Sequence, residues 1–112
     1  MVIAVDFDGT IVKNAFPEIG DELPGAIDTL RRWQSEGDEI ILWTCREEEY
    51  LENAVKWCEK RGLIFNRVNE NTLKNIEFMG YDSRKIVADW YIDDKSVGSI
   101  VWWVLDNQRK ER

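Results

Sequence analysis

Two pairs of aspartates stand where their spacing could do chemistry. Asp6 and Asp8 come at the end of a short apolar run, and Asp93 and Asp94 directly follow another. Alternation along an extended chain lets Asp6 and Asp8 leave the end of a strand on the same side. Carboxylates gathered in one place repel one another unless a hard cation with oxygen ligands neutralises them. These residues therefore predict a magnesium (Mg2+) site.

A sheet of parallel strands would bring the two pairs together. Strands are predicted for the short apolar runs at 2–7, 40–43, 64–68 and 86–92. Helices are predicted where apolar residues recur at helical spacing, at 24–36, 47–61 and 97–108, with a short helix at 72–78 inside a stretch otherwise assigned as loop. Strands that alternate with helices imply right-handed crossovers and a mainly parallel sheet. The expected fold class is α/β, a three-layer α/β/α Rossmann-like arrangement in a single domain over residues 1–112.

Further polar residues flank the other strands, and sites in parallel sheets form at the carboxyl ends of the strands. Thr44, Cys45 and Arg46 follow the second predicted strand, and Lys85 directly precedes the last one. Thr44 alone could simply end a strand, and Lys74 also precedes the acidic pair. Arg46 either binds a substrate phosphate or faces water at the start of a helix. The topology would gather Thr44 and Lys85 near the acids, and the role of Arg46 stays open.

Composition limits the chemistry and the partners. The chain has no histidine, which excludes mechanisms that need an imidazole base, so carboxylates must carry any acid–base step. Its formal net charge of -7 disfavours nonspecific binding to nucleic acid or to an anionic membrane. No apolar run approaches the roughly 20 residues of a spanning helix, and the amino terminus lacks the features of a secretory signal. Two cysteines, Cys45 and Cys58, are expected as reduced thiols, Cys58 in a helix core. We therefore expect a cytoplasmic protein.

The motif Asp6-Phe7-Asp8-Gly9-Thr10 is followed along the chain by Thr44, by Lys85 and by Asp93-Asp94. This order resembles the haloacid dehalogenase-like (HAD) hydrolase superfamily, and the matching residues span positions 6 to 94, nearly the whole chain. The resemblance implies a HAD-like fold and a phosphatase, a phosphoric monoester hydrolase that works through an aspartyl phosphate. Family dehalogenases lack an acid at the position of Asp8, which favours phosphate over halide chemistry.

The resemblance also implies catalytic roles. Asp6 would attack phosphorus and become phosphorylated, which splits one difficult displacement into two easier ones. Asp8 would protonate the leaving oxygen and then take a proton from the attacking water. Thr44 and Lys85 match the roles that stabilise charge on the phosphoryl oxygens.

The resemblance places magnesium on the Asp6 carboxylate, the Asp8 backbone carbonyl and one acid of the terminal pair. Asp94 is the expected direct ligand, with Asp93 behind it. Substrate contacts are expected from four neighbours of these residues, Gly9, Thr10, Cys45 and Arg46.

Most members of this superfamily carry a cap domain over the site, and this chain has no room for one. The site should therefore be open to a phosphorylated small molecule or macromolecule, unless a second copy in a homo-oligomer covers it. The loop at 10–23, which contains Phe16 and Pro17, is the expected flap. Trp102 and Trp103, at the edges of the apolar stripe of the last helix, are candidates for a subunit interface.

Two other classes of protein compete with a phosphatase. Phosphate-receiver signalling modules also combine acids, a threonine and a lysine on a parallel sheet, but in a different order along the chain. A catalytically silent HAD-like protein could keep the fold and use its tryptophans to bind a partner. The lifetime of a phosphorylated aspartate separates the first alternative from a hydrolase, and loss of metal affinity would indicate the second.

Overall fold

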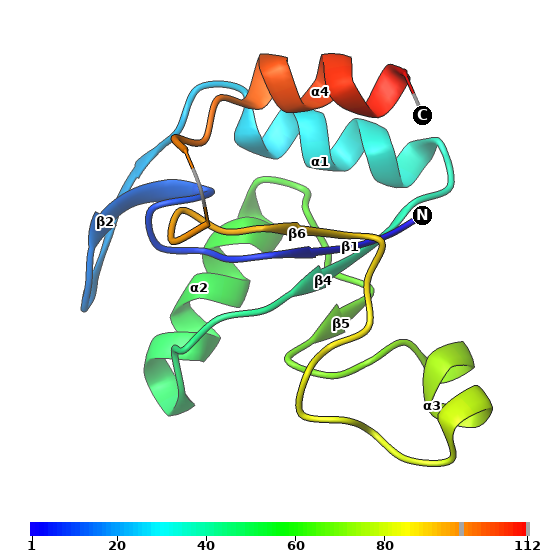
Figure 1. The fold of residues 1–112 in the computed structure, drawn as a ribbon. Coiled ribbons are helices and arrows are strands. Elements are labelled where there is room, and N and C mark those ends of the chain that lie inside the picture. Colours follow the sequence, from blue (N-terminus) through cyan, green and yellow to red (C-terminus); the bar gives the residue numbers. More distant parts are fainter. Residues whose placement is uncertain (97, 112) are drawn as a thin grey trace.

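A parallel sheet forms the centre of the protein in the computed structural model, which describes residues 1–96 and 98–111 (Figure 1). The strands are β1 (Val2–Val5), β2 (Val12–Ala15), β3 (Glu18–Glu22), β4 (Glu39–Leu42), β5 (Arg67–Val68) and β6 (Trp90–Ile92). The parallel strands lie in the order β5-β4-β1-β6, and β2 pairs with β3 in a separate antiparallel hairpin. The helices are α1 (Ala26–Ser35), α2 (Glu48–Lys60), α3 (Leu73–Met79) and α4 (Trp102–Lys110).

Alternate residues of the central strands face two different layers. Ile3 and Val5 of β1, with Ile40 and Leu42 of β4, join one core cluster with buried residues of α1, α2 and α4. The opposite face is covered by a smaller cluster in which Ile86, from the segment between α3 and β6, packs on the sheet. The predicted three-layer α/β/α fold is confirmed, with one thick layer and one thin layer, since α3 has no buried residue.

The predicted helices at 24–36, 47–61 and 72–78 are confirmed within a few residues as α1, α2 and α3. Acidic residues in the first turn of α2 and a lysine in its last turn stabilise the helix through favourable interactions with its dipole. The hydroxyl of Thr72 caps α3 by accepting a hydrogen bond from the amide of Asn75.

Two predicted strands are shorter than expected because side chains satisfy the backbone instead of a strand partner. The stretch 64–68 pairs only at β5, and the Asn66 side chain accepts a hydrogen bond from the amide of Ile40. The stretch 86–92 pairs only at β6, since Asn71 accepts from the amide of Val87. The predicted loop at 10–23 is wrong in part, because it folds into the β2–β3 hairpin.

The last helix begins later than predicted, at Trp102, and Val97 of the expected helix lies outside the described residues. Val101 has an extended backbone, so the helix starts at Trp102, whose side chain is buried in the core. Trp102 is buried, packs 5.9 Å from the ring of Trp33, and donates a hydrogen bond to the Thr10 carbonyl at 2.9 Å. The prediction of Trp102 as an interface residue is therefore wrong, whereas Trp103 is 70% exposed.

Both cysteines are free thiols, as predicted. Cys58 is buried in the core, where burial raises the pKa of its thiol to about 12. Among the helices of the described chain, none has the length and apolar character needed to cross a membrane.

Candidate active site

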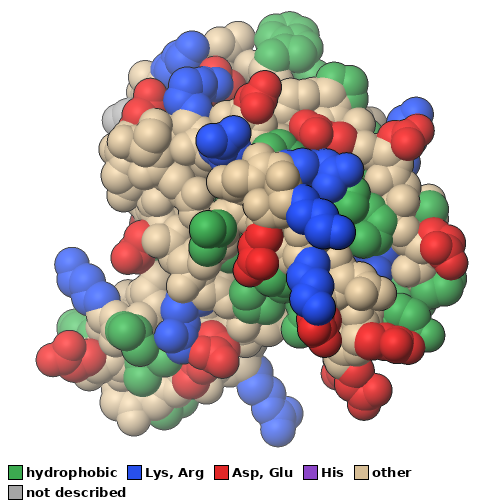
Figure 2. All heavy atoms as spheres, turned by 180° about the vertical axis from the view of Figure 1, so that it is seen from behind, with side chains coloured by type: hydrophobic (Ala, Val, Ile, Leu, Met, Phe, Trp, Pro, Cys, Tyr) green, Lys and Arg blue, Asp and Glu red, His purple; other side chains and the backbone are tan. Residues whose placement is uncertain are grey.

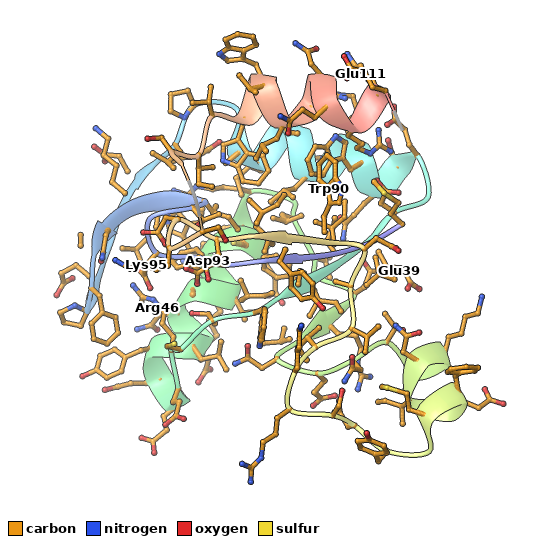
Figure 3. The ribbon with its side chains drawn as sticks, viewed as in Figure 1. Glu39, Arg46, Trp90, Asp93, Lys95 and Glu111 are labelled. Atoms are coloured by element: carbon orange, nitrogen blue, oxygen red, sulfur yellow. The ribbon has the colours of Figure 1, made fainter. Side chains whose placement is uncertain are left out.

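The polar residues of interest lie at one end of the sheet. Figure 3 shows Arg46, Asp93 and Lys95 together, with Glu39 and Trp90 at the opposite end. Glu39 and Trp90 are the first residues of β4 and β6, so the group lies at the carboxyl ends of the parallel strands. This is where the parallel topology predicted a site.

Asp6, Asp93 and Asp94 form a compact group of carboxylates. One oxygen from each lies within 4.8 Å of the others. Strand register explains the approach, because Val5 of β1 pairs with Ile92 of β6 and the Asp6 amide donates to the Ile92 carbonyl at 2.9 Å. The two acidic motifs therefore leave neighbouring strands at the same level.

The environment of Asp6 opposes ionisation. Burial is the main cause, and the nearby carboxylates of Asp93, Asp94 and Asp8 add to it, while a hydrogen bond from the Phe7 amide acts in the other direction. Together they raise the pKa of Asp6 from 3.8 to about 7. In the protein alone, Asp6 therefore holds a proton more readily than an ordinary aspartate does.

Gly9 and Thr10 support Asp94 instead of lining the pocket, which corrects the prediction that they contact substrate. The Thr10 hydroxyl is buried and accepts a hydrogen bond from the Asp94 amide at 3.0 Å. A Cβ atom on Gly9 would lie 2.3 Å from an Asp94 carboxylate oxygen, and Gly9 has a φ of 84°. A side chain is thus excluded twice at Gly9, by the neighbouring carboxylate and by the backbone conformation.

Asp8 lies outside the three-carboxylate group and is held by Arg46. Nε and Nη2 of Arg46 donate to the two Asp8 oxygens at 2.7 and 2.8 Å. The remaining N–H groups donate to the carbonyls of Pro17, Glu18 and Tyr50, and the arginine side chain is 1% exposed. Since all its donors have partners within the protein, Arg46 positions Asp8 and the hairpin, and the prediction that it binds substrate phosphate is not supported.

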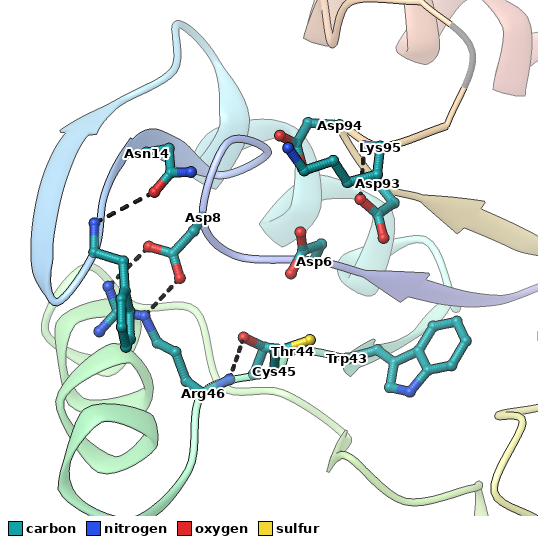
Figure 4. A pocket seen from close by; sticks show the side chains of 11 residues that line it. Asp6, Asp8, Asn14, Trp43, Thr44, Cys45, Arg46, Asp93, Asp94 and Lys95 are labelled. Atoms are coloured by element: carbon teal, nitrogen blue, oxygen red, sulfur yellow. Dashed lines mark hydrogen bonds and ion pairs between the residues drawn. The ribbon is translucent and has the colours of Figure 1, made fainter.

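A pocket of about 630 Å³ opens in front of the carboxylates (Figure 4). Thr44 and Cys45 line it as predicted, together with Asp6, Asp8, Asn14, Phe16, Trp43, Arg46, Asp93, Asp94 and Lys95. The Thr44 amide donates to Asn69, and its hydroxyl accepts from the Arg46 amide. The hydroxyl proton of Thr44 therefore remains available for a ligand.

The lysine of this pocket is Lys95, and the prediction of Lys85 is wrong. Lys85 lies outside the pocket with its Nζ 5.7 Å from the ring centroid of Tyr91, and Lys74 is exposed on α3. Because β6 begins only at Trp90, Lys85 does not directly precede a strand. Figure 4 shows Lys95 beside Asp93 and Asp94.

Three lining residues were missed as site residues. Lys95 directly follows the acidic pair and Trp43 directly precedes Thr44, so their position at strand ends was an available signal. Trp43 ends the predicted strand at 40–43, and it is only half-buried. Asn14 gave no signal, because it reaches the pocket through a hairpin that was expected to be a loop.

The carboxylate group fits a divalent cation of the hard type. Its donors are oxygens only, which magnesium and calcium prefer. Burial is the main cause of the raised pKa of Asp6 and the neighbouring carboxylates add to it, and a bound cation would offset both effects by stabilising the ionised form. Asp93 and Asp94 both lie within the group, so either can supply a ligand oxygen beside Asp6.

No protein-family model matches the sequence, and no curated protein matches it. A solved structure of a conserved protein from Bacteroides thetaiotaomicron is similar, with 46% sequence identity and a TM-score of 0.90 over 99% of this chain and 90% of that one. The chain belongs to the family of that conserved protein. Identity at this level over nearly the full length means that the family shares the α/β/α fold described above.

Proposed function

We propose that this protein is a magnesium-dependent phosphohydrolase, a HAD-type phosphatase in which Asp6 is the nucleophile. The observation that carries the proposal is the convergence of Asp6, Asp93 and Asp94 within 4.8 Å at the carboxyl ends of β1 and β6. This convergence matches the motif order that resembles the HAD superfamily. Free thiols at Cys45 and Cys58 fit the cytoplasm as the proposed compartment.

In the first step, an Asp6 oxygen attacks phosphorus and the bond from phosphorus to the leaving oxygen breaks. The leaving oxygen takes a proton from Asp8 and departs as an alcohol, which leaves an aspartyl phosphate on Asp6. In the second step, Asp8 accepts a proton from water while the water oxygen attacks phosphorus. The bond to Asp6 then breaks, and inorganic phosphate and the original carboxylate are released.

The other residues of the pocket orient these groups. Arg46 holds both Asp8 oxygens, and each oxygen keeps a lone pair for the transferred proton. The Thr44 hydroxyl and the Lys95 ammonium line the same pocket and can donate to phosphoryl oxygens. Asp6 with Asp93 and Asp94 would hold magnesium, which would supply positive charge opposite the phosphoryl group.

The test is hydrolysis of an aryl phosphate by the purified protein with magnesium or with a chelator. We expect turnover only with magnesium, and a loss of about a thousandfold or more in Asp6→Asn. Asp28→Asn is the matched control, because it makes the same change at an exposed site on α1 and should behave as wild type. Turnover that survives in Asp6→Asn would contradict the proposal.

A rapid-quench experiment separates a hydrolase from a receiver module. After mixing with a phosphate ester, a hydrolase should lose its aspartyl phosphate within the turnover time. A phosphorylated Asp6 that persists for many turnover times would favour the receiver interpretation.

A further inference from the structure

The walls of the pocket beyond the carboxylates are aromatic. Trp43 and Arg46 lie on opposite sides of Asp6 in Figure 4. Phe16 is on the Arg46 side, because the guanidinium carbon lies 5.1 Å from its ring centroid. The carboxylate group therefore sits between two aromatic residues, one from the hairpin turn and one from the end of β4.

Both rings are held in place before any ligand arrives. Phe16 is 54% exposed, yet its ring has the Arg46 guanidinium near it and the Tyr50 ring 5.5 Å away. The Trp43 amide donates to the Val5 carbonyl, and its ring packs 5.6 Å from that of Tyr91. Exposed aromatic rings that need no reordering bind a flat ligand at low entropic cost.

The polar side chains of the pocket suit a phosphate better than a large polyhydroxyl group. Arg46 has the most N–H donors of the pocket, and all of them donate to partners within the protein. The uncharged polar residues that remain on the lining are Asn14, Thr44 and Cys45. A volume of about 630 Å³ far exceeds a phosphate group and lies in the range of small-molecule sites. With Lys95 and Thr44 assigned to the phosphate, the rings of Trp43 and Phe16 are the flat apolar surface that remains on the lining.

We propose that the substrate is a phosphate monoester that carries a planar aromatic ring, of the nucleotide type, with the phosphate at Asp6 and the ring against Trp43 or Phe16. This inference rests on the proposed function and adds the substrate class to it. A free mononucleotide and the phosphorylated terminal nucleotide of a strand present the same chemistry to the open pocket.

The decisive comparison is adenosine 5′-monophosphate against ribose 5-phosphate, which carries a hydroxyl at the carbon where the nucleotide carries its base. With magnesium present, we expect kcat/KM to be about tenfold or more higher for the nucleotide, the range expected for stacking on an aromatic side chain. A ratio near one would overturn the inference and leave the proposed phosphatase intact. Short oligonucleotides with a terminal phosphate form the second arm, and their kcat/KM relative to the mononucleotide identifies the source of the ring.

Variants of the two rings test whether the pocket reads the base. Trp43→Leu or Phe16→Leu should lower the nucleotide-to-ribose-phosphate ratio about tenfold. Trp103→Leu and Phe78→Leu are matched controls, because both side chains lie outside the pocket and are exposed. Trp103 on α4 is 70% exposed and Phe78 on α3 is 91% exposed. These controls should keep the wild-type ratio. A ratio that neither pocket variant changes would overturn the assignment of the ring site.

Binding separates failure of the inference from failure of the proposed function. Calorimetric titration of Asp6→Asn with both ligands and magnesium requires no turnover. Tighter binding of the nucleotide would support the ring site even if no ester were hydrolysed. Equal affinities for the two ligands would overturn the inference whatever the catalytic result.

Discussion

Two sets of buried or half-buried acids differ in their partners, since one set has a cationic partner and the other has none. Asp106 accepts two hydrogen bonds from Arg32 at 3.0 Å and one from the Trp33 indole at 2.9 Å. Asp38 accepts from Arg109 at 2.6 Å and from the amino terminus. Each of these acids on the helical side of the molecule is matched by a base.

The carboxylates of the pocket differ. Across residues 1–96 and 98–111, no ion pair within 4.0 Å reaches Asp6, Asp93 or Asp94. Burial, with the repulsion from the neighbouring carboxylates added to it, raises the pKa of Asp6, whereas hydrogen bonds from Arg32 hold the pKa of Asp106 well below its usual range. The fold pairs the buried Asp106 and Asp38 with bases and leaves these three half-buried acids without an ion pair, which is the arrangement expected of a metal site.

On the face of the protein seen in Figure 2, acidic side chains lie near basic ones, as they do at Asp106 and Asp38. Seen from behind in Figure 2, Lys and Arg side chains gather along the middle of the face with acidic side chains beside them. Asp6, Asp93 and Asp94 differ from this surface, because they lie within 4.8 Å of one another without an ion pair among the described residues.

The largest effect on the unpaired group should come from Gly9→Ala. The new Cβ would push against Asp94, and a displacement of about 1 Å in a catalytic group costs about a hundredfold in rate. We expect at least that loss in kcat/KM and weaker magnesium binding by calorimetry. Gly37→Ala is the control, because Gly37 also has a positive φ but no atom within 4 Å of the new Cβ. It should lose about 1 kcal/mol of stability and keep magnesium affinity.

The next effect should come from Arg46→Lys, which keeps the charge and loses the paired donors. A lysine cannot hold both Asp8 oxygens and the hairpin carbonyls at once. We expect kcat to fall about tenfold to a hundredfold, with magnesium affinity nearly unchanged because Asp8 lies outside the three-carboxylate group. Equal kcat in the two proteins would contradict the positioning role.

A moderate effect, on stability alone, should come from Asp106→Ala. The substitution leaves Arg32 and the buried Trp33 indole without their acceptor. Because Arg32 is partly exposed, we expect a loss of about 2 kcal/mol in the free energy of unfolding in urea. Magnesium affinity should stay at the wild-type value, since Asp106 lies on α4 away from the pocket. A loss of metal binding would break the contrast between the two groups of acids.

The last effect is a pH dependence of opposite sign in the two groups. A raised pKa in the fold means that Asp6 stabilises the metal-free protein at low pH, and this contribution is lost as pH rises from 3.8 to about 7. Asp6→Asn should remove that slope in unfolding experiments with a chelator. A lowered pKa means that Asp106 stabilises the protein above pH 3.8 and ceases to do so in stronger acid.

The same pKa predicts how pH affects the metal. Protons compete with magnesium for Asp6, so the metal affinity should rise with pH up to about 7 and level off above it. Calorimetric titrations at three pH values would measure the change. A flat profile would remove Asp6 from the ligand set.

Sequence predicted the parts of the fold that depend on local pattern. Apolar runs located β1 and β4, helical spacing located α1 and α2, and acids at strand ends located the carboxylate group, because parallel topology brings strand ends together. What it missed depends on distant partners. The β2–β3 turn at Phe16 and Pro17 has none of the glycine pairs that mark short hairpins.

The role of Arg46 was equally hidden. Its position after a strand allowed a substrate contact, and only the folded chain brings the carbonyls of Pro17 and Glu18 within reach. Lys95 shows the reverse case, a residue beside a recognised motif that was passed over for Lys85, whose true neighbour is Tyr91. Residues that act through long-range contacts cannot be assigned from spacing alone.

The hydrogen bonds of Arg46 have a consequence for the proposed catalytic cycle. One guanidinium joins Asp8, the hairpin and the start of α2. An outward movement of the hairpin would break the hydrogen bonds that hold Arg46 and Asp8 in place. We therefore expect the hairpin to stay fixed at the edge of the pocket instead of opening and closing over it. We expect ligands to enter and leave by diffusion alone. The chemical step, and not a closing motion, should then limit the rate of each turnover.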